Sequence, residues 1–554
     1  MIAADIMISK QQHTKQSPGN SKVTVNLHGS SRTLEEAYGL AVTETNLGNF
    51  QAALDIYALI TAKIPNFADF HNAQALLLLK MKKYKEALAS FDKTITLKPD
   101  FLEAHINRGL ILQQMGQHDE ALASYAKAIA LKPNYAQIYF NRGLTFQELG
   151  QHEKALTDYS KAIALKPDYA TAYNNRGIVL QEMKHYAKAL ESFDKAIALN
   201  SLYAEAYNNR GFTFYCLGRY DNALANYDKA IATSPHYSEA YWNKGNIKLL
   251  LGEYEEGWPL YEWRWKRQGK PHARIFREPL WLGKENLSGK TILIHAEQGL
   301  GDTIQLCRYV PILEKLGATI LLEVQKSLVP LLAALKGANR VLAYGDALPE
   351  FDFHCPTMSL PLALQTSLNT IPSTIPYLFP NQENLKIWKA HLGEKSRPRI
   401  GLSWSGSISH TNDSNRSMPL TMLAPILCDA FEFHCIQKDL RPRNQEFMEH
   451  SRITSHTAEL HSFLDTASLI SEMDLIISVD TSAAHLAGAL GKKLWLLLPF
   501  APDFRWLDAR KDSPWYPSAC LFRQPDIDDW NSVIAKVNAE LETLASCRKA
   551  QNGL

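Results

Sequence analysis

The sequence lacks long apolar runs, closely spaced cysteines and a strong excess of either charge. No apolar run approaches the roughly 20 residues that a membrane-spanning helix needs, so we expect no transmembrane segment. The formal net charge of +2 argues against nucleic acid as a partner, because a dedicated nucleic-acid surface normally carries a basic excess. Seven cysteines without a CxxC spacing indicate free thiols in a reducing compartment. These absences predict a soluble, cytoplasmic protein.

The first residues also lack the features of a targeting segment. The stretch MIAADIMISKQQHTKQSPGNSK has too short an apolar run for a signal peptide and continues into polar residues. We therefore predict a disordered tail over residues 1–31. The remaining chain is too long for one core, since the whole sequence has 554 residues, and several domains are expected.

A regular repeat runs through the first half of the chain. The repeating glycines are Gly109, Gly143, Gly177, Gly211 and Gly245, and the repeating alanines are Ala87, Ala121, Ala155, Ala189 and Ala223. This spacing of about 34 residues, with prolines at most unit ends, resembles the tetratricopeptide repeat. We predict an α-solenoid over residues 32–268, with units beginning at 34, 68, 102, 136, 170, 204 and, in part, 238. Each unit is two antiparallel helices that bury their apolar faces only by stacking, and the stack has a concave groove.

An asparagine recurs at the sixth position of successive units. This asparagine column consists of Asn107, Asn141, Asn175, Asn209 and Asn243. Each amide either makes a local hydrogen bond between helices or lines the groove and binds a peptide backbone, which offers alternating donors and acceptors. The column resembles that of protein O-GlcNAc transferases, which grips substrate polypeptides. A polypeptide partner in the groove is therefore expected.

The repeat pattern changes after Gly252, in EYEEGWPLYEWRWKRQGKP. We predict that Trp258, Trp263 and Trp265 cover the open end of the solenoid, with carbohydrate stacking as the alternative. Residues 269–288 are predicted to be a linker.

From residue 289 onward, apolar strand candidates alternate with helical segments. The candidates are 291–296, 319–324, 340–343, 351–355, 400–404, 431–437, 475–479 and 494–498. This alternation predicts βαβ units and parallel sheets. We expect two Rossmann-like halves, 289–395 and 396–554, the second ending in a C-terminal helix.

Two motifs in these halves carry a resemblance to a known family. The stretch HAEQGLGDTIQLCRYVPIL places Gly299, Gly301 and Asp302 directly after a strand, but a dinucleotide fingerprint would need a third glycine. In the second half, the stretch DLIISVDTSAAHLAGALGKKLWLLL contains a strand, the DTSAAH motif, a helix, a glycine and a further strand, and GLSWSGSISHTNDSNRS runs from another strand into a loop. In combination they resemble the heptosyltransferases, glycosyltransferase family 9, which have the GT-B fold. The resemblance covers about residues 289–525.

The resemblance implies roles for individual residues. Asp302 would be the general base, and Arg416 would bind the leaving diphosphate. The backbone N–H groups of Thr481, Ser482 and Ala483 begin a helix, which is a favourable anion site. Asp480, His485, Ser405 and Gly406 would complete the donor site, and Gln437 would contact the nucleoside. Asp302 and Asp480 are equally compatible with a role as helix N-caps.

The sequence thus predicts an inverting, metal-independent glycosyltransferase that transfers a hexosyl or heptosyl group from a nucleotide-sugar to an acceptor, plausibly a polypeptide held by the repeats. No cofactor beyond the donor substrate is expected. The alternative is a non-catalytic interaction scaffold with a nucleotide-sugar-binding domain.

Overall fold

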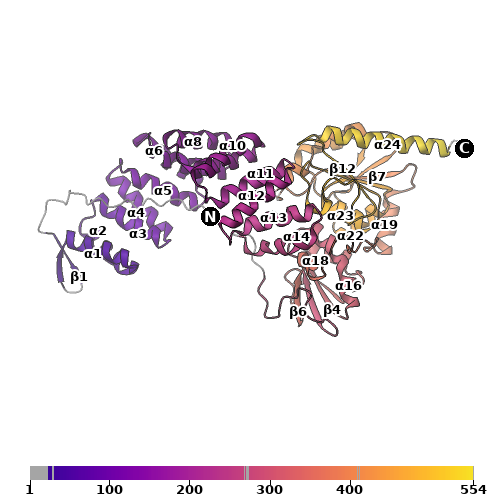
Figure 1. Cartoon of the computed structure of the whole chain (residues 1–554), viewed down its shortest axis with the longest axis horizontal. Coiled ribbons are helices and arrows are strands. Elements are labelled where there is room, and N and C mark those ends of the chain that lie inside the picture. Colours follow the sequence, from indigo (N-terminus) through magenta and orange to yellow (C-terminus); the bar gives the residue numbers. More distant parts are fainter. Residues whose placement is uncertain are drawn as a thin grey trace. The chain divides into compact units, whose positions relative to one another are not determined.

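The structure is a computed structural model that describes residues 23–27, 30–267, 269, 274–408, 410 and 412–552 (Figure 1). It divides into two compact units, Met1–Thr213 and Phe214–Leu554. The predicted disordered tail lies outside the described residues at 1–22 and 28–29. Its remaining part is ordered: β1 (Thr24–Leu27) pairs antiparallel with β2 (Ser30–Thr33). The prediction of disorder through residue 31 is therefore wrong at this hairpin, where Val25 is buried against the first helices.

The first unit is a series of antiparallel helix pairs. Its helices are α1 (Leu34–Leu47), α2 (Phe50–Lys63), α3 (Ala68–Lys80), α4 (Tyr84–Leu97), α5 (Leu102–Gln114), α6 (His118–Leu131), α7 (Ala136–Glu148), α8 (His152–Leu165), α9 (Ala170–Glu182), α10 (Tyr186–Leu199) and the greater part of α11 (Ala204–Cys216). The turn within a pair needs a left-handed residue, as at Gly116, where φ is 73°. Two units place Lys82 and Lys184 in this conformation instead.

The glycine repeat has a packing cause. A Cβ at Gly109 would lie 2.6 Å from the ring of Tyr125, and one at Gly177 would lie 2.6 Å from the ring of Phe193. Each glycine therefore lets the first helix of a unit approach an aromatic ring on the second. The repeating alanines are fully buried in the same stacks.

The second unit begins with the last repeat helices. After the end of α11 these are α12 (Tyr220–Thr233), α13 (Ser238–Leu250) and α14 (Tyr254–Tyr261), followed by the 3-10 turn η1 (Glu262–Lys266). Trp258 is buried, and its Nε1 donates to the carbonyl of Thr366 at 3.1 Å. Trp263 stacks on Tyr241 with ring centroids 3.8 Å apart. These contacts agree with a packing role for both tryptophans.

Residues from 274 onward do not form a free linker. Arg274 pairs with the buried Glu323, and Phe276 packs against His295 and His354. Trp281 is also buried. The predicted linker at 269–288 is thus wrong for its described part from 274, which packs against strands of the first sheet and pairs with His354 through Leu280. Residues 270–273 lie outside the described residues.

The first sheet contains four parallel strands in the order β5-β4-β3-β6. They are β3 (Thr291–His295), β4 (Thr319–Val324), β5 (Arg340–Ala343) and β6 (Phe353–Pro356). Between and after the strands run the short helices α15 (Leu300–Leu306), α16 (Val310–Lys315), α17 (Val329–Leu332) and α18 (Leu360–Ala363), and then α19 (Gln382–Leu392). All four strands fall at predicted positions.

The second sheet contains six parallel strands in the order β12-β11-β10-β7-β8-β9. They are β7 (Arg399–Ser403), β8 (Glu432–Cys435), β9 (Ile453–Thr454), β10 (Leu475–Val479), β11 (Leu494–Leu498) and β12 (Ala519–Arg523). The helices are α20 (Asp413–Arg416), α21 (Gln445–His450), α22 (Phe463–Ser471), α23 (Ser482–Ala489) and the C-terminal α24 (Trp530–Asn552). The prediction missed the edge strands β9 and β12. The C-terminal part is thus α/β with two parallel sheets.

Candidate functional site

Both sheets have a point at which the strand order reverses. In the six-stranded sheet the order along the chain is 3-2-1-4-5-6, so the reversal lies between β7 and β10; in the four-stranded sheet it lies between β3 and β6. Ligands of open α/β sheets bind beyond the carboxyl ends of the strands at such points. The segments that follow β3, β7 and β10 lie there, and they carry Asp302 in α15, Arg416 in α20 and Asp480 in the turn before α23.

The motifs of the two halves touch each other. Helix α15 packs on α23, and a Cβ at Gly301 would lie 2.7 Å from Cδ2 of His485. Gly301 thus allows the GLGD turn to approach the helix of the DTSAAH motif. The structure therefore brings together two segments that lie far apart in the sequence, one in each half.

Asp302 uses both of its carboxylate oxygens within the protein. Oδ2 accepts from the N–H of Gly299 at 2.7 Å, the capping-box arrangement for α15, and Oδ1 pairs with Arg505. The side chain is 18% exposed. Asp302 is therefore not the N-cap of α15, which is Gly299, but the third residue of the helix, and its side chain accepts from the N-cap N–H. Each oxygen retains a second lone pair for a ligand.

Asp480 makes no helix cap. The N-cap of α23 is Thr481, whose own side chain makes no capping bond and contacts Ser478 instead. Oδ1 of Asp480 lies 3.7 Å from Nε2 of His485. Burial and the neighbouring Asp503 raise the pKa of Asp480 to about 6. A buried carboxylate with a raised pKa and no capping role is a candidate functional group.

The surroundings of His485 favour its neutral form. It is buried, and burial together with Arg505 holds its pKa well below its ordinary value. Nδ1 lies 3.0 Å from the hydroxyl of Tyr516, and the ring stacks on Trp506. A neutral imidazole fixed in this way offers Nε2 as a hydrogen-bonding group, and it supplies no positive charge to a phosphate.

Arg416 lies beside the start of α23. Its Nη1 donates to the carbonyl of Asp480 at 3.1 Å, and a Cβ at Gly406 would lie 2.5 Å from its Nη2. Gly406 therefore admits the guanidinium to this position. The N–H groups of Ser482 and Ala483, in the first turn of α23, have no acceptor within the helix, so a cation and a helix N-terminus lie together.

Gln437 is used internally. Its Oε1 accepts from the N–H of Trp404 at 3.0 Å, and its Nε2 donates to the carbonyl of Asp439 at 2.9 Å and to Ser405 at 3.3 Å. Both Gln437 and Ser405 are buried. Gln437 thus holds the loop that follows β7 in place, and its contact with a nucleoside stays a prediction.

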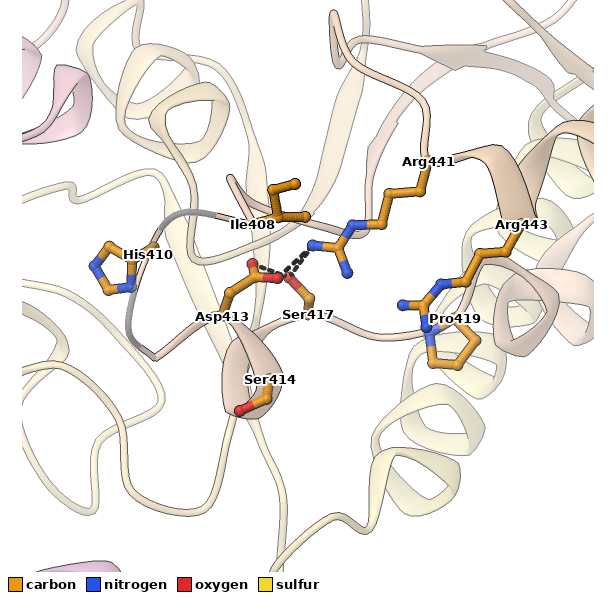
Figure 2. Close-up of a pocket in the computed structure, with 8 residues that line it drawn as sticks. All are labelled: Ile408, His410, Asp413, Ser414, Ser417, Pro419, Arg441 and Arg443. Carbon is orange, nitrogen blue, oxygen red and sulfur yellow. Dashed lines mark hydrogen bonds and ion pairs between the residues drawn. The ribbon is translucent and has the colours of Figure 1, made fainter. Parts of the chain in front are cut away.

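A pocket of about 660 Å³ opens beside this loop. Figure 2 shows its lining residues Ile408, His410, Asp413, Ser414, Ser417, Pro419, Arg441 and Arg443. Arg441 reaches Asp413, whose other oxygen accepts from Ser417 at 2.6 Å (Figure 2). Burial and the nearby Arg416 lower the pKa of His410. The pocket thus lies next to the predicted diphosphate-binding residues and presents two further arginines.

Arg505 is a functional candidate that sequence reasoning missed. It is buried, and it pairs with Asp302 and, at 2.7 Å, with Asp503, while its Nε donates to Gln305 at 2.9 Å. Although burial opposes its charge, Asp302 and Asp503 raise its pKa. Arg505 thereby joins the second half to α15 of the first. No repeat or motif marks it in the sequence.

A second missed candidate is the acid Glu297, two residues after the end of β3. Its Oε1 pairs with the buried Arg264 at 2.9 Å and accepts from the N–H of Met358. Burial raises its pKa to about 7, against the opposing effect of Arg264. The signal in the sequence was present, since Glu297 belongs to the same loop as Gly299 and Asp302.

The asparagine column is only partly accessible. Asn107 and Asn141 are almost fully buried, so their amides do not line an open groove, and the prediction is wrong for these two. Asn175 is half-buried and donates to the carbonyl of Thr171. Asn209 is half-buried and donates to Asn174 at 3.1 Å, and Asn243 is half-buried on α13.

Among the described residues, no helix is both long and apolar enough to cross a membrane. Within the same residues, no group of three or more His, Cys, Asp or Glu side chains is placed to hold a metal ion.

The raised pKa of Asp480 gives a first prediction, on stability. A carboxyl whose pKa is higher in the folded than in the unfolded protein destabilises the fold once it is ionised. Asp480→Asn should therefore raise the free energy of unfolding at pH 8 by about 1–3 kcal/mol. The gain should shrink as the pH falls from about 6 towards 4 and vanish only well below 4, where the wild-type carboxyl is protonated in both states. Denaturant titrations at several pH values check this, and a loss of stability at pH 8 would show that the carboxylate is favourably paired.

Comparison with known proteins identifies the N-terminal repeats. The family described as "TPR repeat" matches residues 109–150 and 145–184. Of two families described as "Tetratricopeptide repeat", one matches residues 170–201 and 204–237, and the other matches residues 38–101. The N-terminal region is thus a tetratricopeptide-repeat solenoid. Repeats of this kind bind peptides or proteins, so this part of the chain is a protein-interaction scaffold.

Relatives resemble parts of the chain. Protein FlbA of Caulobacter vibrioides is 24% identical over 318 residues, which cover 52% of this chain and 53% of FlbA. The chain thus spans about half the length of that relative. Among solved structures, a tetratricopeptide repeat protein from Parabacteroides merdae is 19% identical, with a TM-score of 0.37, over 41% of this chain and 91% of its own. YrrB, described as a TPR protein with an unusual peptide-binding site, is 23% identical, with a TM-score of 0.30, over 33% of this chain and 95% of its own.

Proposed function

We propose that the chain is a glycosyltransferase with a GT-B-like pair of Rossmann-type halves, which transfers a sugar from a nucleotide-sugar to an acceptor. The observation that carries the proposal is the convergence of Asp302, Arg416, Asp480 and His485 at the strand-order reversals of two parallel sheets. The resemblance of their motifs to the heptosyltransferases assigns these same positions to donor binding and catalysis.

The donor diphosphate is assigned to the first turn of α23. The N–H groups there and the positive end of the helix dipole favour an anion. Arg416 lies against the same turn, and its planar guanidinium suits two phosphate oxygens at once. Arg441 and Arg443 line the adjoining pocket, where Arg441 is paired with Asp413.

The reaction is an inverting displacement without a metal ion. The acceptor oxygen attacks the anomeric carbon, the bond from that carbon to the diphosphate oxygen breaks, and the acceptor proton passes to a carboxylate. Asp302 is the proposed base, while Asp480 accepts hydrogen bonds from sugar hydroxyls. Arg416 and the α23 N–H groups stabilise the charge on the departing diphosphate.

The acceptor is proposed to be a polypeptide presented by the repeats. Tetratricopeptide repeats supply a polypeptide-binding surface in the same chain, and a net charge of +2 does not favour nucleic acid. The cysteine pattern supports a reducing, cytoplasmic location. All seven cysteines, at described positions, are free thiols.

The direct test is release of nucleoside diphosphate. The full chain is incubated with a panel of nucleotide-sugars, with and without an unfolded protein as acceptor. We expect one donor to give nucleoside diphosphate and a mass increase of one sugar residue on a polypeptide. Binding of a donor without any turnover would favour the alternative below.

The alternative is a scaffold whose α/β part binds a nucleotide-sugar without transferring the sugar. One observation favours it: both oxygens of Asp302 are engaged, by the N–H of Gly299 and by Arg505. For Asp302 to act as the general base, one of these two contacts must break, or a free lone pair of the carboxylate must face the acceptor hydroxyl.

The accessible asparagines give a second prediction, on acceptor binding. Asn175→Ala with Asn209→Ala should weaken polypeptide binding by about five- to 150-fold, because each of the two amide hydrogen bonds contributes about 0.5–1.5 kcal/mol. Helicity and donor binding should stay unchanged. The matched control is Asn107→Ala, which removes a buried amide and should affect the melting temperature instead. Equal peptide affinity in the double variant and the wild type would place the acceptor elsewhere.

A further inference from the structure

A second column of side chains runs beside the asparagines. The seventh position of successive units holds a cation, and this cation column consists of Arg108, Arg142, Arg176, Arg210 and Lys244. Each cation can meet either of two side chains. The preceding position is the one earlier in the chain, on the second helix of the preceding unit. The following position is the same number of residues later in the chain than the cation, on the second helix of the cation's own unit.

Four of the five cations have one aspartate at one of these two positions. Arg108 pairs with Asp92 at the preceding position, at 2.7 Å, and Lys244 pairs with Asp228 in the same way, at 2.6 Å. Arg210 likewise pairs with Asp194 at the preceding position. Arg142 uses the following position: its Nε and Nη2 bind both oxygens of Asp158 at 2.7 and 2.8 Å.

Arg176, on α9, is the exception. Both positions are serine: Ser160 on α8 is at the preceding position, and Ser192 on α10 is at the following one. Its Nε donates to Ser192 at 3.2 Å, and among the residues that the structure describes no carboxylate forms an ion pair with it. The guanidinium lies over the ring of Tyr173 at 5.2 Å.

The electrostatics of Arg176 differ accordingly. Burial lowers its pKa, with Tyr173 and Glu191 only partly opposing this effect, whereas Asp158 raises the pKa of Arg142. A half-buried guanidinium without a counter-ion is costly, and an anion that supplies the missing pair lowers that cost. The exposed Ser160 leaves the site open where the other units place an exposed aspartate.

We propose that Arg176 is a recognition site for a carboxylate side chain of a bound polypeptide, which takes the place of the aspartate absent from this unit. The carboxylate would accept from the guanidinium nitrogens as Asp158 does from Arg142. Ser160 would border the entry. The inference does not rest on sugar transfer, because binding at Arg176 needs no donor.

The test fills the proposed site with a carboxylate of the chain itself. Ser160→Asp supplies the aspartate at the position used by Asp92, Asp194 and Asp228. Ala126→Asp is the matched control: Ala126 is exposed, lies at the same position of its unit, and precedes Arg142, which Asp158 already satisfies. Arg176→Gln removes the cation itself. The probes are a labelled hexaglutamate peptide, a hexaglutamine peptide of equal length, and inorganic phosphate.

Hexaglutamate should bind the wild type and Ala126→Asp alike, and should bind Ser160→Asp and Arg176→Gln about five-fold more weakly. Ser160→Asp alone should also raise the melting temperature, by about 1–3 °C. Hexaglutamine should not distinguish the variants. Equal weakening by Ser160→Asp and Ala126→Asp, or none by either, would overturn the proposal. The proposal would also be overturned if Arg176→Gln weakened the binding of inorganic phosphate but not that of hexaglutamate, because this result would indicate a site for free phosphate.

Discussion

Replacing Asp302 by asparagine should lower the rate of sugar transfer by roughly 10²–10⁴-fold while leaving donor affinity nearly unchanged. The asparagine side chain keeps the shape of the carboxylate but does not accept the acceptor proton. The measurement is single-turnover transfer together with calorimetric donor binding, both on the full chain.

Asp302 also pairs with the buried Arg505, so loss of that ion pair needs its own control. Asp503→Asn removes the other carboxylate partner of Arg505 and leaves Asp302 in place. We expect this variant to retain transfer within about ten-fold of the wild type. A loss equal to that of Asp302→Asn would assign both acids to positioning Arg505, and near-normal transfer by Asp302→Asn would assign Asp302 to capping α15.

Removing the proposed diphosphate contacts should weaken donor binding strongly. Arg416→Ala and Asp480→Ala are each expected to reduce nucleotide-sugar affinity by ten-fold or more, about 1.4 kcal/mol. The first loses charge-assisted hydrogen bonds to phosphate, and the second loses acceptors for sugar hydroxyls. Isothermal calorimetry with the donor found by screening measures both.

Arg452→Ala is the control for charge removal. Arg452 precedes β9 of the same sheet, is 57% exposed, and pairs with Asp429 on the surface. Its replacement should leave donor affinity unchanged. Unchanged affinity in Arg416→Ala and Asp480→Ala as well would remove the proposed donor site.

The fold was largely predictable because two periodicities are strong. The repeat period arises from glycines that must admit the rings of Tyr125 and Phe193, and the buried parallel strands are continuous apolar runs. The hairpin at β1 and β2 was missed because its residues are mostly polar, as they are in a disordered segment. The edge strand β9 was missed because it has only two residues, Ile453 and Thr454.

The candidate site was predictable only where a motif marks it. Gly301 and His485 belong to recognisable segments, and the structure brings them into contact. Arg505 has no such mark, because its role arises from the tertiary approach of Asp302. The asparagine column was assigned to the groove from spacing alone, and spacing does not reveal that Asn107 and Asn141 point into the helix packing.

The most direct test of the donor site is the thermal shift of the wild type and Arg416→Ala across a panel of nucleotide-sugars, because a ligand that binds the folded chain raises its melting temperature by mass action. We predict that at least one nucleotide-sugar raises the melting temperature of the wild type, by more than its free sugar does, and that Arg416→Ala loses most of this shift. A panel in which no nucleotide-sugar stabilises the wild type, or in which Arg416→Ala responds equally, would contradict the assignment of the α/β part to nucleotide-sugar chemistry.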